Sequence, residues 1–301
     1  MSTIIIYGAG CQGRALLRLL KNRPEPPLVH CFLDADPAKQ GGFVEGYPIH
    51  SPNYLLGLDQ EAFTVSVAVG AHYPTVRRAL EGLGLKEGLH FRDEAHHPIT
   101  YKELNAGFAA LVDRVRPHTL LSEDRLALLY QAVLRVQALP GDAAEVGVYK
   151  GGTAYLIAAA LFPSGKKLHL FDTFCGIPIT DPDIDLHRQG DFADISLEIV
   201  ERLLKPFSCC RLHPGRFPET LSPDCQENSF SFVHVDVDIY QSAVDCCSYF
   251  YPRLTRGGIM IFDDYGFSTC PGIRRAVDEY FFRDPSRILY LSTGQALVFK
   301  N

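Results

Sequence analysis

The chain has 301 residues and a formal net charge of −6, and 47% of its residues are hydrophobic. This length allows two domains or one large α/β domain, and the composition is ordinary for a soluble globular protein. The negative charge argues against a general binder of nucleic acid or of anionic membranes. No apolar run approaches the roughly 18 residues of a membrane span, and the N-terminus lacks the charged start and cleavage site of a signal peptide.

Strand and helix patterns alternate over the first 98 residues. An apolar run at 3–7 ends in a glycine turn, and helical spacing follows over 11–22. Two more strands are expected at 28–36 and 63–70, before a helix at 73–85. This pattern predicts a small Rossmann-like unit over 1–98, too short to hold both domains of a dinucleotide-dependent dehydrogenase. We expect its boundary at "DEAHHPIT", just before a second unit over 99–301.

Glycines in the first unit match G-x-G-x-x-G between a strand and a helix, at Gly8, Gly10 and Gly13. Asp34 ends the next strand, where a ribose-binding acid would lie. The stretch is similar to the nucleotide-binding-like N-terminal domains of sugar O- and N-acyltransferases, which bind nucleotide or substrate or serve in assembly. The glycines therefore predict either a nucleotide site or only a tight strand–helix turn.

The second unit opens with helical patterns through about residue 137. Apolar strand patterns then alternate with helical ones, and the last 15 residues read as two strands about a turn at Thr293 and Gly294. Parallel strands that alternate with helices predict an open, doubly wound α/β sheet, here with a C-terminal antiparallel hairpin. The strands are expected at 142–147, 166–174, 229–238, 257–266 and 287–301.

Acids and glycines follow two of these strands. Glu145 and Gly147 end the first strand, Gly151 and Gly152 enter the next helix, and Asp172 ends the second strand. Ligands of open sheets bind at such strand ends, where glycines allow a close approach and an acid can bind a ribose. Because Glu145 disfavours a nearby pyrophosphate, a ribose plus a cationic amino-acid group fits better, which describes S-adenosylmethionine.

Carboxylates also follow two strands that we expect to be neighbours. Asp236 ends the run "SFVHV", and Asp263 and Asp264 end "GGIMIF". Clustered carboxylates repel one another, and a shared Mg²⁺ or other divalent cation relieves that repulsion. Asp238 would point to the opposite side of a continued strand, so capping or indirect support is its expected role, with direct ligation as the alternative.

Several stretches resemble the macrocin-type sugar O-methyltransferases over residues 117–283. They are "PGDAAEVGVYKGGTA", "LFDTFCGIP", "RFPETL", "VHVDVDIYQSAVDCCSYFYPRLTRGGIMIFDDYG" and "CPGIRRAVDEYF". The resemblance implies a class I fold, dependence on S-adenosylmethionine and Mg²⁺, and methylation of sugar hydroxyls in natural products. It implies that the metal is held by Asp236, Asp263 and Asp264, and that the methyl donor is surrounded by Glu145, Gly147, Tyr149, Gly151, Gly152 and Asp172. The family usually has Trp and Arg where Tyr149 and Lys150 stand.

A metal-dependent O-methyltransferase with a Rossmann-like accessory domain is thus the leading hypothesis. The general base is expected among Asp236, His187 and Asp191. The last two come from the loop 175–195, whose sequence departs from the family's pattern. The alternatives are an NAD(P)-dependent oxidoreductase that uses the N-terminal glycines, and a non-catalytic nucleotide-binding scaffold. We expect a sugar or glycoside acceptor, no nucleic acid or membrane partner, and a homo-oligomer.

Nine cysteines occur along the chain, none of them in a Cys-x-x-Cys pair. Their spacing fits neither a zinc motif nor a secreted disulfide framework. We therefore expect mostly buried, reduced thiols in a cytoplasmic protein.

Overall fold

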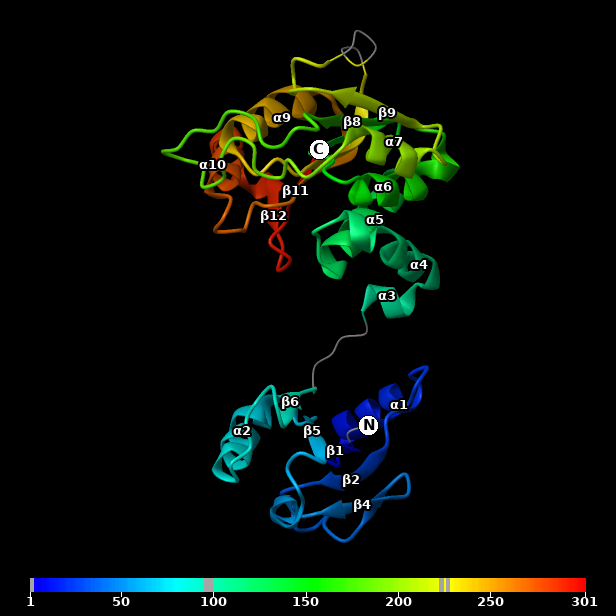
Figure 1. Cartoon of the computed structure of the whole chain (residues 1–301), viewed down its shortest axis with the longest axis vertical. Helices are drawn as coiled ribbons and strands as arrows, with labels where there is room; N and C mark the ends of the chain where they lie inside the picture. Colours follow the sequence, from blue (N-terminus) through cyan, green and yellow to red (C-terminus); the bar gives the residue numbers. More distant parts are fainter. Residues whose placement is uncertain (1–2, 95–99, 222–224, 226–227) are drawn as a thin grey trace. The chain divides into compact units, whose positions relative to one another are not determined.

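The computed structural model describes residues 3–94, 100–221, 225 and 228–301. It divides into two compact units, Met1–Ile99 and Thr100–Asn301 (Figure 1). The expected boundary at "DEAHHPIT" falls mostly on residues 95–99, which lie outside the described residues. Within the described residues, no helix is long and apolar enough to cross a membrane.

The first unit contains a six-stranded sheet in the order β3-β4-β2-β1-β5-β6. Only the pair β3 and β4 is antiparallel. Helix α1 packs its leucines on one face of the sheet, and α2 covers the other face. The expected strands and helices are present, whereas the short strands β3, β4 and β6 were not expected. The elements are β1 (Thr3–Tyr7), α1 (Cys11–Lys21), β2 (Val29–Leu33), β3 (Phe43–Val44), β4 (Tyr47–His50), β5 (Phe63–Val67), α2 (Tyr73–Gly82) and β6 (Phe91–Asp93).

The second unit contains a seven-stranded sheet in the order β12-β13-β11-β10-β7-β8-β9. All neighbours from β11 to β9 are parallel, and β13 runs antiparallel to both β11 and β12. The predicted doubly wound sheet with a terminal antiparallel hairpin is confirmed. The strands are β7 (Asp142–Val146), β8 (Leu168–Asp172), β9 (Cys210–Pro214), β10 (Phe230–Val235), β11 (Leu254–Phe262), β12 (Ile288–Tyr290) and β13 (Ala296–Phe299).

Helices cover both faces of this sheet (Figure 1). One hydrophobic core joins the sheet to α4, α5, α6 and α7, and a second core joins its other face to α9 and α10. Both faces are therefore buried, which explains why β10 is apolar almost throughout rather than alternating. The helices are α3 (Tyr101–Leu104), α4 (Ala106–Val115), α5 (Glu123–Val136), α6 (Gly152–Leu161), α7 (Leu197–Leu204), α9 (Tyr240–Arg253) and α10 (Pro271–Tyr280).

Two local features differ from the sequence expectation. The helical stretch after residue 100 breaks at Asn105, because the Asn105 side chain caps α4 by accepting a hydrogen bond from the N–H of Phe108 at 2.9 Å. The edge strand β9 has the short sequence "CRLHP", whose polar residues carry no clear strand pattern. It joins the sheet through five parallel pairings with β8.

Candidate active site

A cavity of about 340 Å³ opens in the second unit at the carboxyl ends of the central strands. The sheet order reverses here, because β7 has β8 on one side and β10 on the other. Such a switch point is where open α/β sheets bind ligands. The predicted residues that line the cavity are Gly147, Tyr149, Asp172, His187, Asp236 and Asp264. Five other predicted residues, all within the described ranges, lie outside its lining: Glu145, Gly151, Gly152, Asp191 and Asp263.

A tight glycine turn follows β7. Gly147 has a φ of +87°, and a Cβ there would lie 1.7 Å from the carbonyl oxygen of Asp236. Glycine therefore lets the ends of β7 and β10 come together. Gly152 serves helix packing instead, since its Cβ would lie 2.6 Å from the carbonyl oxygen of His118. Gly151, with a φ of +83°, is the N-cap of α6. Gly147 thus shapes the cavity, whereas the other two glycines position α6.

We expect Gly147→Ala to reduce the free energy of unfolding by more than about 2 kcal/mol. The left-handed φ costs an alanine about 1–2 kcal/mol, and the overlap with Asp236 adds to that cost. Chemical denaturation measures the loss. Gly165→Ala is the matched control, because Gly165 has a φ of +70° but a Cβ there meets nothing within 4 Å. Equal losses in the two variants would contradict the close contact between the strand ends.

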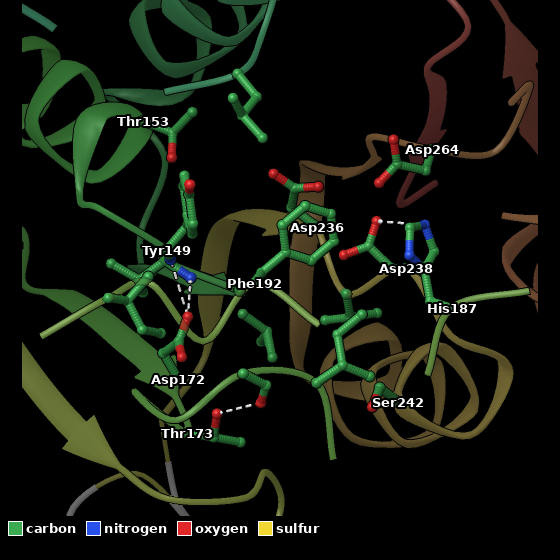
Figure 2. Close-up of a pocket in the computed structure, with 18 of the residues that line it drawn as sticks. Tyr149, Thr153, Asp172, Thr173, His187, Phe192, Asp236, Asp238, Ser242 and Asp264 are labelled. Carbon is green, nitrogen blue, oxygen red and sulfur yellow. Dashed lines mark hydrogen bonds and ion pairs between the residues drawn. The ribbon is translucent and has the colours of Figure 1, made fainter. Parts of the chain in front are cut away.

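Asp172 holds this turn from the end of β8. Its Oδ2 accepts hydrogen bonds from the N–H groups of Val148 at 2.7 Å and Tyr149 at 2.9 Å. Its Oδ1 accepts a third from the N–H of Phe174 at 2.7 Å. Figure 2 shows Asp172 beside Tyr149 on one side of the cavity. The carboxylate is thus fixed in position where a nucleoside would enter.

Three carboxylates line the other side of the cavity (Figure 2). Asp236 and Asp238 follow β10, and Asp264 follows β11. Burial, and then the charges of Asp264 and Asp238, raise the pKa of Asp236 well above its usual range. Burial and then Asp264 raise the pKa of Asp238 to about 6, although nearby His187 opposes the rise. The three side chains therefore converge, as carboxylates do around a cation.

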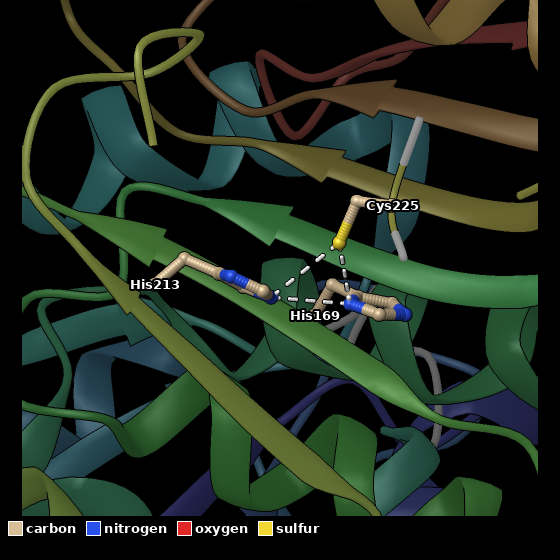
Figure 3. A group of neighbouring side chains, drawn as sticks. All are labelled: His169, His213 and Cys225. Atoms are coloured by element: carbon tan, nitrogen blue, oxygen red, sulfur yellow. Dashed lines mark hydrogen bonds between the residues drawn. The ribbon is translucent and has the colours of Figure 1, made fainter. Parts of the chain in front are cut away.

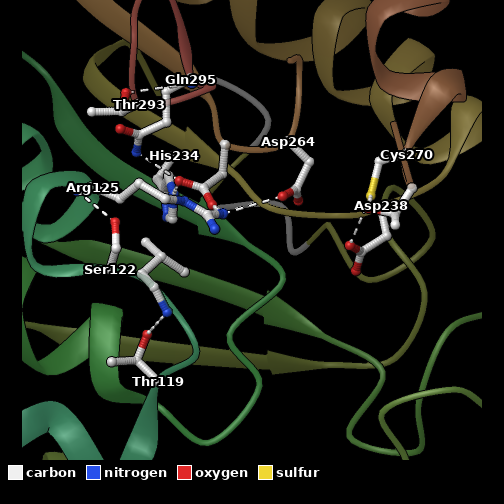
Figure 4. Close-up of polar contacts among 12 residues, drawn as sticks. Thr119, Ser122, Arg125, His234, Asp238, Asp264, Cys270, Thr293 and Gln295 are labelled. Carbon is white, nitrogen blue, oxygen red and sulfur yellow. Dashed lines mark hydrogen bonds and ion pairs between the residues drawn. The ribbon is translucent and has the colours of Figure 1, made fainter. Parts of the chain in front are cut away.

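Asp263 is fully buried below these groups and forms an ion pair with Arg125 of α5. The same guanidinium lies 3.1 Å from Asp264, as Figure 4 shows, so one cation links the two consecutive aspartates. Gln295 donates a hydrogen bond to Asp263 at 2.6 Å. Oxygens of Asp236 and Asp263 and a nitrogen of His234 lie within 4.8 Å of one another. The structure thus brings the three predicted metal-binding acids together, with Asp263 beneath the cavity floor.

Glu145 is fully buried, as Asp263 is. Its Oε1 is 2.8 Å from Nδ1 of His234, its partner in the register of β7 and β10. The other ring nitrogen of His234 lies 3.6 Å from Asp263. Glu145 therefore supports the carboxylates from below, through His234. Sequence analysis did not identify Arg125, His234 or Gln295. For His234, the available signal was a polar side chain within the apolar pattern "FSFVHV".

We expect Arg125→Met to reduce the free energy of unfolding by about 3–5 kcal/mol, because Asp263 would keep a buried charge without its cation. Thermal unfolding in EDTA measures this loss. Mg²⁺ should restore part of it if the carboxylates bind a cation. Arg275→Met is the control, since Arg275 pairs with Glu279 at an exposed site and its loss should leave the melting temperature near that of the parent chain. A variant as stable as the parent chain in EDTA would contradict the role of Arg125.

The loop 175–195 forms a further wall of the cavity. Buried Asp185 anchors it by accepting a hydrogen bond from the N–H of Tyr240, at the start of α9, at 2.8 Å. Tyr149 donates to Asp194 at 3.1 Å and packs edge-on against Phe192. The apolar lining from this loop is Ile177, Pro178, Phe192 and Ile195. The loop therefore gives this wall of the cavity a partly apolar surface.

His187 projects from this loop toward the carboxylates (Figure 2). Its Nε2 lies 4.0 Å from Asp238, and its Nδ1 lies 3.4 Å from Asp191. Asp191 also accepts a hydrogen bond from the N–H of Arg188 at 2.9 Å, which fixes its carboxylate. An imidazole with one nitrogen facing a cavity and the other facing a carboxylate can act as a base.

A cavity of about 310 Å³ lies at the glycine turn of the first unit. A Cβ on Gly13 would lie 1.7 Å from the carbonyl oxygen of Gly8, so these two glycines make the turn possible. Gly10 lines the cavity, and a Cβ there would meet nothing within 4 Å. Asp34 accepts hydrogen bonds from the N–H of Ala9 at 2.9 Å and from Lys39 at 3.0 Å. Asp34 therefore stabilises the glycine turn and also lines the cavity.

Comparison with known proteins identifies the second unit. The sequence profile of the macrocin O-methyltransferase family (TylF) matches residues 109–288. This chain belongs to that family. It is therefore an O-methyltransferase, and the predicted resemblance is confirmed.

Individual relatives agree with the family assignment. Demethyldecarbamoylnovobiocin O-methyltransferase of Streptomyces niveus is 30% identical over 221 residues, covering 67% of this chain and 82% of the relative. Mycinamicin III 3''-O-methyltransferase of Micromonospora griseorubida is 32% identical over 182 residues, covering 54% and 70%. The structure of the O-methyltransferase NovP matches with a TM-score of 0.53 and 27% identity, covering 61% of this chain and 82% of that one. The macrocin O-methyltransferase match lies wholly within the second unit.

Proposed function

We propose that this O-methyltransferase transfers a methyl group from S-adenosylmethionine to a hydroxyl of a sugar or glycoside and that it requires Mg²⁺ or a similar divalent cation. The observation that carries the proposal is one cavity with two opposed sides. The Gly147 turn and Asp172 form one side, and Asp236, Asp238 and Asp264 form the other.

The donor side suits a nucleoside. Asp172 is held rigidly by three backbone N–H groups at the end of β8, where an acid binds ribose hydroxyls. Gly147 leaves space for close approach at the end of β7, and Tyr149 offers a ring to the cavity. Glu145 contributes indirectly, because its carboxylate is engaged by His234 below the cavity.

The acidic side suits a hard divalent cation. Asp236, Asp263 and Asp264 would hold it, because carboxylate oxygens are the ligands that Mg²⁺ prefers. The fit is supported by Asp236 and Asp264, which both line the cavity, and by the raised pKa of Asp236, which burial and then neighbouring carboxylates cause and which a bound cation would relieve. A bound divalent cation supplies Lewis-acid activation and positioning of an acceptor hydroxyl.

The chain's own residues orient the acceptor and accept its proton. The loop 175–195 closes over the acceptor with apolar side chains, which exclude water from the methyl group. His187 is proposed to take the hydroxyl proton at Nε2, while Asp191 holds the other ring nitrogen. Asp236 remains an alternative acceptor for the proton. Alignment of the hydroxyl with the donor then provides the proximity that transfer requires.

The relatives support the proposed class of acceptor. Two of them are named as O-methyltransferases of demethyldecarbamoylnovobiocin and of mycinamicin III. For this chain we propose a sugar hydroxyl within a glycoside or an activated sugar. The first unit is proposed to be an accessory nucleotide- or sugar-binding domain. Support comes from the cavity at Gly10 and from Lys39, whose positive charge suits a phosphate.

Calorimetric titration with S-adenosylhomocysteine tests the donor site. We expect micromolar binding by the parent chain and binding at least about 10-fold weaker by Asp172→Ala, because the variant loses the ribose-binding carboxylate and loosens the glycine turn. Asp183→Ala is the control, because Asp183 is exposed and lies outside the cavity lining. Equal affinity in all three proteins would refute the role of Asp172. Binding of NAD(P) with no binding of S-adenosylhomocysteine would favour the oxidoreductase alternative.

A further inference from the structure

A second group of ligating side chains lies outside the active-site cavity. It consists of His169 on β8, His213 on the edge strand β9, and Cys225 in the segment before β10 (Figure 3). Cys225 and His169 are buried, and His213 is partly buried. These positions are far apart in sequence, yet Figure 3 shows the three side chains pointing toward one another.

The distances within this group match those of a metal's ligands. Nδ1 of His169 lies 3.1 Å from Nε2 of His213 and 3.2 Å from Sγ of Cys225. The sulfur lies 3.7 Å from Nε2 of His213. Tetrahedral zinc binds nitrogen at about 2.0–2.1 Å and thiolate at about 2.3 Å, which separates adjacent ligand atoms by roughly 3.3–3.6 Å. The three atoms therefore stand at nearly the separation that one zinc ion imposes.

Surrounding groups hold the ligands in this arrangement. The second nitrogen of His169 lies 3.4 Å from the carboxylate of Asp142, which in turn accepts a hydrogen bond from Asn228 at 3.2 Å. A carboxylate behind a ligating histidine is the usual support in metal sites, because it fixes the ring and its tautomer. His213 stacks on Phe171 with ring centroids 4.5 Å apart.

The chemistry of the donor set also suits a metal. A neutral imidazole keeps a lone pair for a metal, whereas an imidazolium does not. Cysteine and histidine together prefer zinc among the common divalent ions, whereas carboxylates prefer Mg²⁺. The donor set here is thus chemically distinct from the acidic group in the active-site cavity.

We propose that His169, His213 and Cys225 bind one Zn²⁺ ion. With three protein ligands, the fourth position is left for water on the partly exposed side of His213. The ion would tie the edge strand β9 and the side chain of Cys225 to β8. Because Phe171 stacks on His213 and also lines the active-site cavity, the zinc site would stiffen the wall beside Asp172.

Zinc binding by the full chain tests this proposal. The protein is stripped with a chelator, dialysed, and titrated with Zn²⁺, with the bound metal counted by elemental analysis. We expect one tightly held zinc per chain and a rise in the melting temperature of about 5 °C or more. Co²⁺ in its place should give the absorption of a tetrahedral site with a thiolate-to-cobalt charge-transfer band. A stripped chain that takes up no zinc would overturn the proposal.

Variants assign the ion to this group. Cys225→Ser should remove the charge-transfer band, and both Cys225→Ser and His213→Gln should weaken zinc binding at least about 100-fold. Asp236→Asn should retain the zinc, because it alters only the carboxylate group. Cys247→Ser, a buried thiol of α9, controls for the loss of a cysteine, and circular dichroism verifies folding. Zinc binding that is retained in both ligand variants but lost in Asp236→Asn would refute the assignment.

Discussion

Asp236→Asn is expected to lower the rate of methyl transfer by about 10³-fold or more, which is the scale of losing a preorganised electrostatic contact in an active site. An oxygen of Asp236 lies within 4.8 Å of one of Asp263, and the charge of Asp264 also acts on Asp236. Asparagine keeps the shape of the side chain but removes its negative charge. Initial rates of S-adenosylhomocysteine formation at saturating Mg²⁺ measure the effect.

The same substitution should have the opposite effect on stability without metal. Converging carboxylates repel one another, so the asparagine variant should melt at or above the temperature of the parent chain in EDTA. The parent chain should gain stability from Mg²⁺, and the variant should gain much less. Asp183→Asn, an exposed change in the loop 175–195, should match the parent chain throughout. Full activity in Asp236→Asn would refute the proposed metal site.

His187→Gln is expected to lower kcat by about 10²-fold, the lower range for loss of a general base. The imidazole faces the acidic side of the cavity, 4.0 Å from Asp238. Glutamine cannot take the proton of the acceptor hydroxyl. Asp191→Asn should have a smaller effect of about 10-fold, because Asp191 only orients the ring across 3.4 Å. The pH dependence of kcat, measured from acid to neutral pH, reports the loss of the base.

A control variant distinguishes a change in the loop's conformation from the loss of a general base. Gln189→Ala changes an exposed neighbour of His187 in the same loop and should leave both kcat and KM near those of the parent chain. If His187→Gln kept the parent pH profile and lost only affinity for the acceptor, His187 would be a binding group. Asp236 would then be the stronger candidate for the base.

Strand ends were the part of the site that the sequence could predict. Apolar runs that stop at acids placed Asp172, Asp236 and Asp264 at one edge of a sheet, and these residues do line one cavity. The direction of each side chain was harder to predict. Successive residues of a strand point to opposite faces. Asp263 and Asp264 lie just past the end of β11, where this rule no longer fixes the direction. Asp264 lines the cavity, whereas Asp263 is buried against Arg125.

Contacts between distant segments explain what the sequence could not show. Glu145 pairs with His234 because the register of β7 and β10 sets them side by side, and no local pattern reveals that register. Arg125 lies 139 positions from Asp264. The zinc ligands proposed here likewise come from β8, from the unpredicted strand β9, and from the segment before β10, so cysteine spacing alone could not indicate them.

We propose that methyl transfer from S-adenosylmethionine depends on a divalent cation held by Asp236, Asp263 and Asp264. The decisive test incubates the full chain with S-adenosylmethionine and a panel of sugar glycosides, in Mg²⁺ and in EDTA. We predict that S-adenosylhomocysteine and an O-methyl product form in equal amounts with Mg²⁺, fall to background in EDTA, and return when Mg²⁺ but not Zn²⁺ is added in excess. Turnover that continues unchanged in EDTA would contradict the account.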